Sequence, residues 1–486
     1  MTAALGIGFF VALAALYFMR LPTTVQFGDT GELVMAAVGR FVAHPPGYPL
    51  WVWFQELMIN VLPVKTEYWR AAFVNSIFSL VAFWFMWLHL ERGLLAFALV
   101  AALAFSRVVW RYSLLPDVFA LHILFTSIVL YLYFQQGRKP WHGPAMVFAF
   151  CVAFSHHLTI VFLTPIVWHV MWRDRRQPGI WLALVAGSAV SAAFYLSLQL
   201  RNPEHLFSWG EITSFEAVVD HFLRRDYGTF QLVGTNQEGS LLANIAALLR
   251  TLADAFWALA VVGVGLAAAV VVSRSRKKNS ETAPENRPLV DLYDALTLLS
   301  LALYVVIFLA LSNTPLDGYR IEVIERFFIM VEVILCFAIG RLILKVLARQ
   351  PKLHTQIAAG LLAIAAVVNF ARYQKFNDFS QNHIVEEYLR NFFAEAPTNR
   401  KVVMITATDT RYFGARFAQA VLKVSPEVMV TSPKVLIFQW AAKKFVRETG
   451  LSFDMEKVLR LNHLDLTSDL VMPNLDRVHF LSLYPL

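Results

Sequence analysis

The sequence predicts a mainly helical membrane protein with a small α/β domain at its C-terminal end. Of the 486 residues, 58% are hydrophobic and only 16% are charged, which is too apolar for a soluble protein of this length. Many apolar segments reach the roughly 17 to 25 residues that a helix needs to cross a bilayer. From about residue 374 the composition becomes that of a soluble protein. The chain therefore divides into a transmembrane domain, 1–373, and a soluble domain, 374–486.

The basic residues indicate how the chain is oriented. The formal net charge is +8, and most basic clusters lie in short loops between apolar segments. Such loops stay in the cytoplasm by the positive-inside rule, so nucleic acid is not an expected partner. The only two cysteines, Cys151 and Cys336, lie within apolar runs, which argues against disulfides or a thiolate metal site.

About eleven membrane helices account for the apolar segments. The first covers Ala3 to Met19, and the shorter amphipathic segment Leu50 to Leu62, with Trp51 and Trp53, is expected to lie in the membrane interface. Further single spans are expected at 71–90, 93–109, 118–134, 180–198, about 240–274, 292–311 and 357–370. Residues 144–172 are expected to form two short helices. One more span should follow an outer loop that ends at Arg326 and should continue to residue 344. With this count the basic loops share one face, and the loops with carboxylates or histidines share the other.

The soluble domain shows alternating strand and helix patterns. Residues 402–408, 427–430 and 477–483 are typical of strands, and residues 412–421 are typical of a helix. The order predicts a small α/β domain outside the membrane.

Two carboxylates follow the first helix in Gly28-Asp-Thr-Gly-Glu-Leu33. Ionisable groups at membrane depth are costly, so Asp29 and Glu32 indicate a functional site. A carboxylate held beside a hydroxyl can remove its proton as a general base. Alternatively, Asp29 only caps the helix that starts at Thr30.

The next motif, His44-Pro-Pro-Gly-Tyr-Pro49, is either a stiff turn or a phosphate site built on His44 and Tyr48. Asp117, before the fourth helix, is either a second carboxylate of the site or a cap. His122, one turn further, faces either the core or the cavity.

His156 and His157 break the 144–172 segment. Adjacent helical residues point about 100° apart and no third histidine is near, so phosphate binding or packing is favoured over a metal. The outer-side arginines bind either phosphate or anionic lipid headgroups; they are Arg224, Arg225, Arg320 and Arg326.

These motifs, together with Pro116-Asp-Val-Phe-Ala-Leu-His122, Ser155-His-His-Leu-Thr159 and Arg224-Arg-Asp-Tyr-Gly-Thr229, resemble those of the GT-C superfamily of glycosyltransferases. The first-loop pair is similar to the branch of protein O-mannosyltransferase-like membrane proteins. The resemblance implies an inverting transferase in which Asp29 matches the catalytic acid of the first loop. Asp117 stands where such proteins often have Glu.

The resemblance further implies a polyprenyl-phosphate-sugar donor, with a hexose such as mannose, and an acceptor hydroxyl on a protein, a glycan or a lipid. The sequence shows no required cofactor and no metal site, and it leaves the oligomeric state open. The expected location is a bacterial inner membrane, with the site and the C-terminal domain on the periplasmic side. The alternatives are a secondary transporter or lipid flippase, whose sites should lie near the bilayer midplane, and a non-catalytic scaffold.

Overall fold

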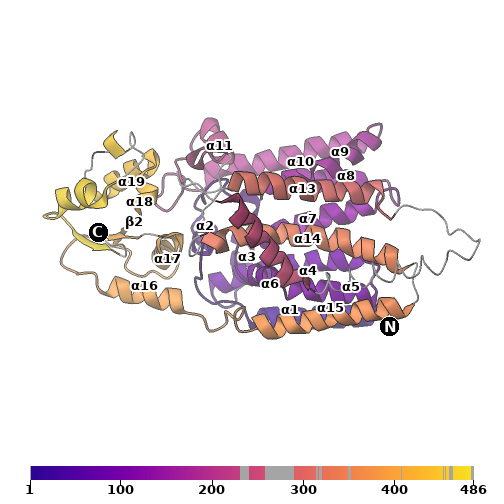
Figure 1. Cartoon of the computed structure of the whole chain (residues 1–486). Helices are drawn as coiled ribbons and strands as arrows, with labels where there is room; N and C mark the ends of the chain where they lie inside the picture. The colour runs from indigo at the N-terminus through magenta and orange to yellow at the C-terminus, as the bar shows by residue number, and fades with distance from the viewer. Residues whose placement is uncertain are drawn as a thin grey trace, which may run out of the picture.

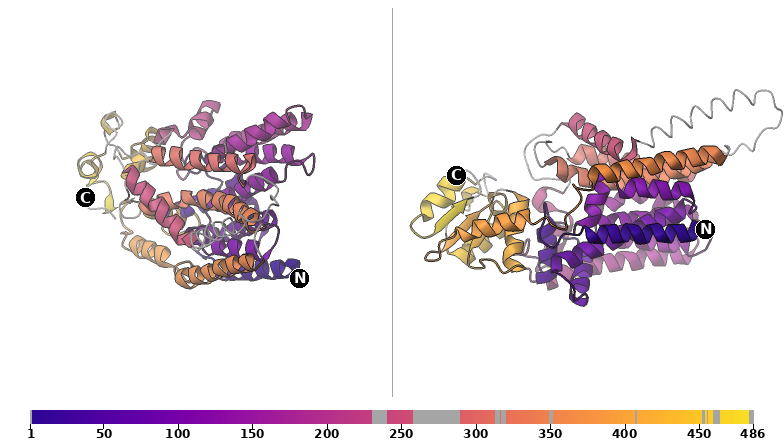
Figure 2. Two further views of the ribbon diagram at one scale, coloured as in Figure 1. Left: turned by 45° about the vertical axis from the view of Figure 1, so that its right-hand side comes forward. Right: turned by 90° about the horizontal axis from the view of Figure 1, so that it is seen from below.

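The computed structural model describes residues 2–229, 240–257, 289–312, 316, 320–348, 352–406, 408–451, 454, 456–458 and 464–482. Its helices form a bundle with roughly parallel axes, and the C-terminal residues pack as a separate layer on one end of that bundle (Figure 1). The first helix begins at the opposite end, as the two further views also show (Figure 2).

The helices of the bundle confirm a multi-span membrane protein. Five described helices are long and apolar enough to cross a bilayer: α4 (Glu67–His89), α10 (Pro178–Leu196), α13 (Leu292–Ser312), α14 (Arg320–Leu347) and α15 (Lys352–Tyr373). The bent pair α5 (Leu94–Ala104) and α6 (Arg107–Leu114) would make a sixth. Shorter apolar helices complete the described bundle: α1 (Thr2–Met19), α2 (Thr30–Gly39), α7 (Phe119–Phe134), α8 (His142–Ala153), and η1 (Leu158–Leu163) followed by α9 (Thr164–Arg173).

The span expected over 93–109 is not one straight helix. It ends at Ala104, and α6 leaves at 72° to α5. Ser106 has an extended backbone (φ −63°, ψ 147°), and its hydroxyl donates to Oε2 of Glu332 at 2.8 Å. Residues 107–109, which were expected to end this span, therefore lie in the separate helix α6.

The amphipathic segment forms α3 (Pro49–Val61). It exposes Phe54, Leu57 and Val61, as expected for a helix lying against lipid. The expected interfacial position of Trp51 is wrong. That side chain is fully buried, and its Nε1 donates to Oδ1 of Asn75 at 3.0 Å.

The outer loop expected before residue 326 is partly helix. Glu322, Glu325 and Arg326 lie in the first two turns of α14. The helix starts this early because Ile324, Phe327 and Phe328 recur at helical spacing and are buried. The expected span after residue 240 is helical over 241–257, and its remainder lies outside the described residues.

The C-terminal region contains the expected small sheet. The strands β1 (Val402–Ile405), β2 (Met429–Thr431) and β3 (His479–Ser482) pair in parallel in the order β2-β1-β3. All four residues of β1 are buried because its two faces enter different cores. The helices of this region are α16 (Ile384–Ala394), α17 (Asp409–Ala420), α18 (Pro433–Leu436) and α19 (Gln439–Thr449).

The helix α17 docks this region directly onto α2, the helix that follows Asp29. The backbone N–H of Gly28 donates to Oγ1 of Thr410 at 3.0 Å. A Cβ at Gly31 would lie only 3.0 Å from the carbonyl oxygen of Phe413, so the close approach of the two helices requires glycine there.

Candidate active site

The carboxylate of Asp29 is held by an arginine from a distant helix. Asp29 stands at the N-cap of α2 but makes no side-chain capping bond. Its Oδ2 instead accepts from Nη1 of Arg326 at 2.6 Å. Burial alone would raise the pKa of Asp29, but the positive charges of Arg326, His44 and Arg224 outweigh it and hold the pKa below its ordinary value. Asp29 is therefore an ionised carboxylate at neutral pH, as a general base must be.

Arg326 also approaches the other expected carboxylate. Its Nη1 lies 3.9 Å from Oδ2 of Asp117, whose Oδ1 accepts from the backbone N–H of Val118 at 2.6 Å. Asp117 is only 2% exposed, and burial, reinforced by Asp29 against the opposing Arg326, raises its pKa to about 6. The guanidinium of Arg326 thus lies near both carboxylates, and the pKa of Asp29 is lower than that of Asp117.

Glu32 does not face the cavity but holds His44. Its two carboxylate oxygens pair with the backbone N–H and the Nδ1 of His44, at 2.8 and 2.5 Å. Burial alone would lower the pKa of His44, but the adjacent Glu32 carboxylate outweighs it and raises the pKa above its ordinary value. The Glu32 carboxylate thus favours the protonated form of His44 and fixes the orientation of its ring.

The His-Pro-Pro-Gly-Tyr-Pro motif is both a turn and part of the site. Gly47 has φ +86°, and a Cβ there would lie 2.9 Å from Nε2 of His221. The turn brings the Tyr48 hydroxyl to 3.4 Å from Nε2 of His44. The Tyr48 ring also stacks at 5.9 Å on that of His157, from the break before η1.

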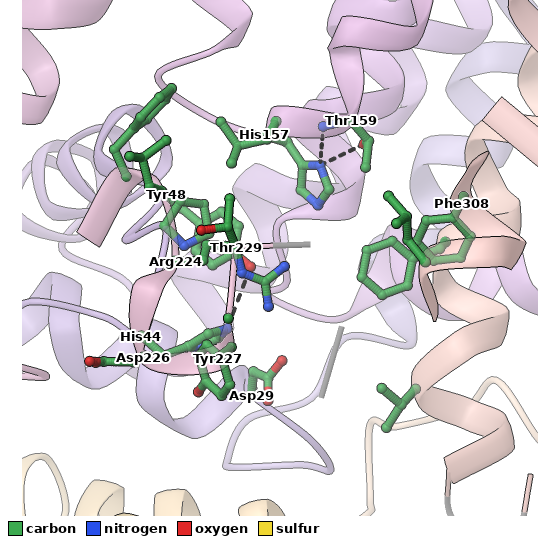
Figure 3. A pocket seen from close by; sticks show the side chains of 18 of the residues that line it. Asp29, His44, Tyr48, His157, Thr159, Arg224, Asp226, Tyr227, Thr229 and Phe308 are labelled. Carbon is green, nitrogen blue, oxygen red and sulfur yellow. Dashed lines mark hydrogen bonds between the residues drawn. The ribbon is translucent and has the colours of Figure 1, made fainter. Parts of the chain in front are cut away.

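A single cavity of about 1220 Å³ connects these groups (Figure 3). Six of the expected site residues line it: Asp29, His44, Tyr48, His157, Arg224 and Arg326. They come from the first loop, the break before η1, the segment after α11 (Phe215–Phe222) and the start of α14. The structure therefore brings together side chains that are almost 300 residues apart in the chain.

Of the other expected site residues, those whose side chains are described do not line this cavity. His122 lies behind it, where its Nε2 is 3.0 Å from Oγ1 of Thr159, and Thr159 is also 2.7 Å from Nδ1 of His157. Nε2 of His156 pairs with the Val118 carbonyl at 2.8 Å. Arg225 is 56% exposed in an ion pair with Asp220, and the side chain of Arg320 lies outside the described residues.

One wall of the cavity is apolar and lies on the side of the membrane helices. It is formed by η1 and α9, by α13, and by the start of α14, through Leu158, Val161, Phe162, Pro165, Trp168, Leu303, Ile307, Phe308, Leu311, Val323 and Phe327. Val161, Trp168, Ile307 and Leu311 are 38 to 62% exposed, so this wall opens onto the outside of the bundle.

From the sequence, we did not identify the residues that line the cavity on the side opposite the apolar wall. Asp226, Tyr227 and Thr229 belong to a motif from which only the two arginines were selected, and their side chains line the cavity. Trp209 donates from Nε1 to Oδ2 of Asp226 at 2.8 Å. The C-terminal region adds Asp409, Tyr412, Phe413, Ser432, Lys434, Val435, Ile437 and Phe438, which no local pattern could assign to the site.

The described residues contain no group of three or more His, Cys, Asp or Glu side chains that could hold a metal ion. Within these residues, the positive charge beside Asp29 is supplied by Arg326, with His44 and Arg224 nearby.

The comparisons with known proteins agree with the first-loop motif. The family model of the protein O-mannosyl-transferase TMEM260 N-terminal domain matches residues 29–179, which confirms the resemblance to protein O-mannosyltransferases. The chain is 25% identical over 466 residues to the protein O-mannosyl-transferase TMEM260 of Mus musculus, and 23% identical over 486 residues to that of Dictyostelium discoideum. These matches include 90% and 89% of this chain, but the chain spans only 64% and 57% of the two relatives.

The fold is similar to that of ArnT from Cupriavidus metallidurans. The crystal structure of that protein bound to undecaprenyl phosphate superposes with a TM-score of 0.51 at 14% identity, over 94% of each chain. Its apo structure matches with the same TM-score at 15% identity, over 93% of this chain and 96% of that one. Both O-mannosyl-transferase relatives are eukaryotic, so they do not support the bacterial inner membrane expected from the sequence.

Proposed function

We propose that this chain is an inverting glycosyltransferase that moves a hexose, such as mannose, from a polyprenyl-phosphate carrier to a protein hydroxyl. The observation that carries the proposal is one cavity that joins an apolar, outward-opening wall to an ionised carboxylate, two arginines and a histidine whose pKa is raised. The names of the two relatives support mannose and a protein acceptor.

The apolar wall of α9 and α13 suits the polyprenyl tail. A prenyl chain needs an apolar path that is open to the hydrocarbon, and Trp168 and Ile307 border such an opening. The carrier phosphate would then lie where this wall meets Arg224, His44 and Tyr48. Arginine and imidazolium groups bind phosphate oxygens through charge-assisted hydrogen bonds.

The proposed reaction is a single displacement. Asp29 takes the proton of the acceptor hydroxyl, and the hydroxyl oxygen forms a bond to the anomeric carbon. The bond from that carbon to the phosphate oxygen breaks, and its electron pair leaves with the carrier phosphate. Attack opposite the leaving group inverts the anomeric centre without a covalent glycosyl-enzyme. Arg224 and His44 stabilise the charge that develops on the leaving phosphate.

We further propose that about eleven spans over residues 1–373 cross the membrane, with 374–486 and the cavity on the extracytoplasmic side. In support, α15 ends at Tyr373, and the basic turn after α9 lies at the end of the bundle away from the C-terminal layer (Figure 1).

The transporter alternative expects ionisable groups near the midplane. Glu332, half-way along α14, is such a group, but it is fully buried, bonds to Ser106 and does not line the cavity.

The test is transfer of radiolabelled mannose from a synthetic polyprenyl-phosphate-mannose to a Ser/Thr peptide by the purified protein. Asp29→Asn should lower kcat by about 100- to 10,000-fold, because the amide cannot accept the hydroxyl proton. The variant should still fold, since the amide oxygen can accept from Arg326.

The matched control is Asp220→Asn, which removes a carboxylate from an exposed ion pair outside the cavity. It should transfer mannose at the wild-type rate. Near-normal turnover by Asp29→Asn would exclude Asp29 as the base, and no turnover by the wild-type protein with any carrier would argue for the transporter alternative.

A further inference from the structure

We propose that the C-terminal region binds the acceptor polypeptide, and that Asp409 and Lys434 are the side chains that hold it beside Asp29. This inference rests on the proposed function, which leaves this region without a task. Asp409 is the first residue of α17 and Lys434 lies in α18. Both line the cavity that contains Asp29, and both are exposed.

The position of the two walls assigns the substrates to opposite sides. The apolar wall of α9 and α13 belongs to the membrane helices, so the tail of a lipid-linked donor can enter only there. The C-terminal region packs on the end of the bundle (Figures 1 and 2), and it supplies the wall furthest from the membrane. An acceptor chain that arrives from water therefore meets this wall first.

The wall is held in a defined position relative to the proposed base. Thr410, next to Asp409, accepts from the backbone N–H of Gly28, next to Asp29, at 3.0 Å. The ring of Phe413 stacks on that of His44 with centroids 6.3 Å apart. A group bound at Asp409 is therefore presented to the first loop at a fixed distance, as transfer to one chosen hydroxyl requires.

The chemistry of the wall suits an extended polypeptide. A peptide offers both N–H donors and carbonyl acceptors, and the wall offers a carboxylate and an ammonium group to pair with them. Tyr412 and Phe438 add aromatic surface to the same cavity. Aromatic side chains contribute large contact areas at little entropic cost in peptide recognition.

The test measures steady-state transfer of labelled mannose to a Ser/Thr peptide by the full-length protein. We expect Asp409→Asn and Lys434→Gln each to raise the peptide KM by about tenfold or more, as the loss of one hydrogen bond to a charged group would. The donor KM should change less than twofold. The ratio of label transferred to peptide over label released to water should fall by a similar factor.

Conservative and matched variants separate binding from misfolding. Lys434→Arg keeps the charge and should restore the peptide KM to within about twofold of wild type. Glu427→Gln and Lys443→Gln remove exposed charges of the same region that do not line the cavity, and should leave the peptide KM unchanged. As a second measurement, a photoreactive acceptor peptide should crosslink to residues 408–413 or 432–438 of the wild-type protein.

A peptide KM within twofold of wild type in both Asp409→Asn and Lys434→Gln, while transfer persists, would overturn the acceptor site alone. A rise in donor KM instead would also overturn it, because the wall would then bind the sugar carrier. Absence of any transfer by the wild-type protein would overturn the proposed function and this inference with it.

Discussion

At the scale of single residues, the site places ionised groups in a buried setting by pairing them. Arg326 contacts Asp29 at 2.6 Å and Asp117 at 3.9 Å, and its side chain is only 14% exposed. Buried charges are tolerated only when a partner compensates them. Arg326 therefore supports the fold and also holds Asp29 in its ionised form.

Removal of this guanidinium should destabilise the protein. Arg326→Gln removes from two neighbouring carboxylates the guanidinium that lies between them, which should lower the free energy of unfolding by about 3–5 kcal/mol. The melting temperature of the detergent-solubilised protein reports the loss. Arg225→Gln, which breaks an exposed ion pair, should cost less than about 1 kcal/mol. Equal melting temperatures for the two variants would contradict this assignment.

The pair of Glu32 and His44 predicts a pH dependence of donor binding. The pKa of His44 is raised above its ordinary value, so the imidazolium is present at lower pH and is lost as the pH rises through the folded-state pKa. The kcat/KM for the donor should therefore fall on the alkaline side, and His44→Gln should remove this dependence. The profile is measured between about pH 5.5 and 9, around the ordinary histidine pKa.

Glu32→Gln provides the complementary measurement. Without the carboxylate, the pKa of His44 should drop, and the alkaline fall should move to lower pH. An alkaline limb that persists unchanged in His44→Gln would mean that another group titrates.

At the scale of elements, the loop between α10 and α11 joins the bundle to the C-terminal region. Lys444, in α19, is only 1% exposed, and its Nζ lies 2.7–3.0 Å from the carbonyl oxygens of Pro203, His205, Ser208 and Gly210, which share its three N–H donors. Trp209, within this loop, in turn holds Asp226 at the cavity wall. One ammonium group thus fixes the path of a loop that leads into the site.

Lys444→Met should loosen this contact while preserving most of the side-chain volume. Four carbonyls would lose a charged donor, so amide hydrogen exchange in residues 203–210 should accelerate by about tenfold or more. Lys443→Met, at the exposed neighbouring position, is the control and should leave the exchange unchanged. Equal protection of the loop in both variants would show that Lys444 does not hold it.

At the scale of the whole molecule, the C-terminal region closes the cavity at one end of the bundle (Figure 1). Its lining comes from the first loop, from membrane helices and from the turns around α17 and α18. The proposed topology requires this end to face away from the cytoplasm. The two native cysteines are buried, which makes cysteine labelling a clean measure of sidedness.

A cysteine introduced at Gln381 should react with a membrane-impermeant maleimide added from outside, because this exposed residue follows α15 on the proposed outer side. A cysteine at Gln177, in the exposed basic turn before α10, should react only after permeabilisation. The reverse pattern of labelling would invert the topology.

The sequence by itself determined the features that depend on local composition and spacing. Apolar length and helical period predicted the spans α4, α13 and α15, and the strand pattern of 402–408 predicted β1, which covers Val402–Ile405. The first-loop motif identified Asp29 and His44 because polar residues stand out against an apolar chain. The break at His156 and His157 was likewise visible as polar residues inside an apolar run.

Only the tertiary structure decided which of these groups share one cavity. Asp29 pairs with Arg326, which is 297 positions away in the chain. Glu32 occurs in the same motif as Asp29, but its carboxylate pairs with His44 instead. Asp409 and Lys434 lie in ordinary helix starts. Asp409 reaches the cavity on α17, which approaches α2 closely at Gly31, and Lys434 reaches it from α18. Local patterns report what a segment can form, whereas the neighbours of a side chain depend on how distant elements pack.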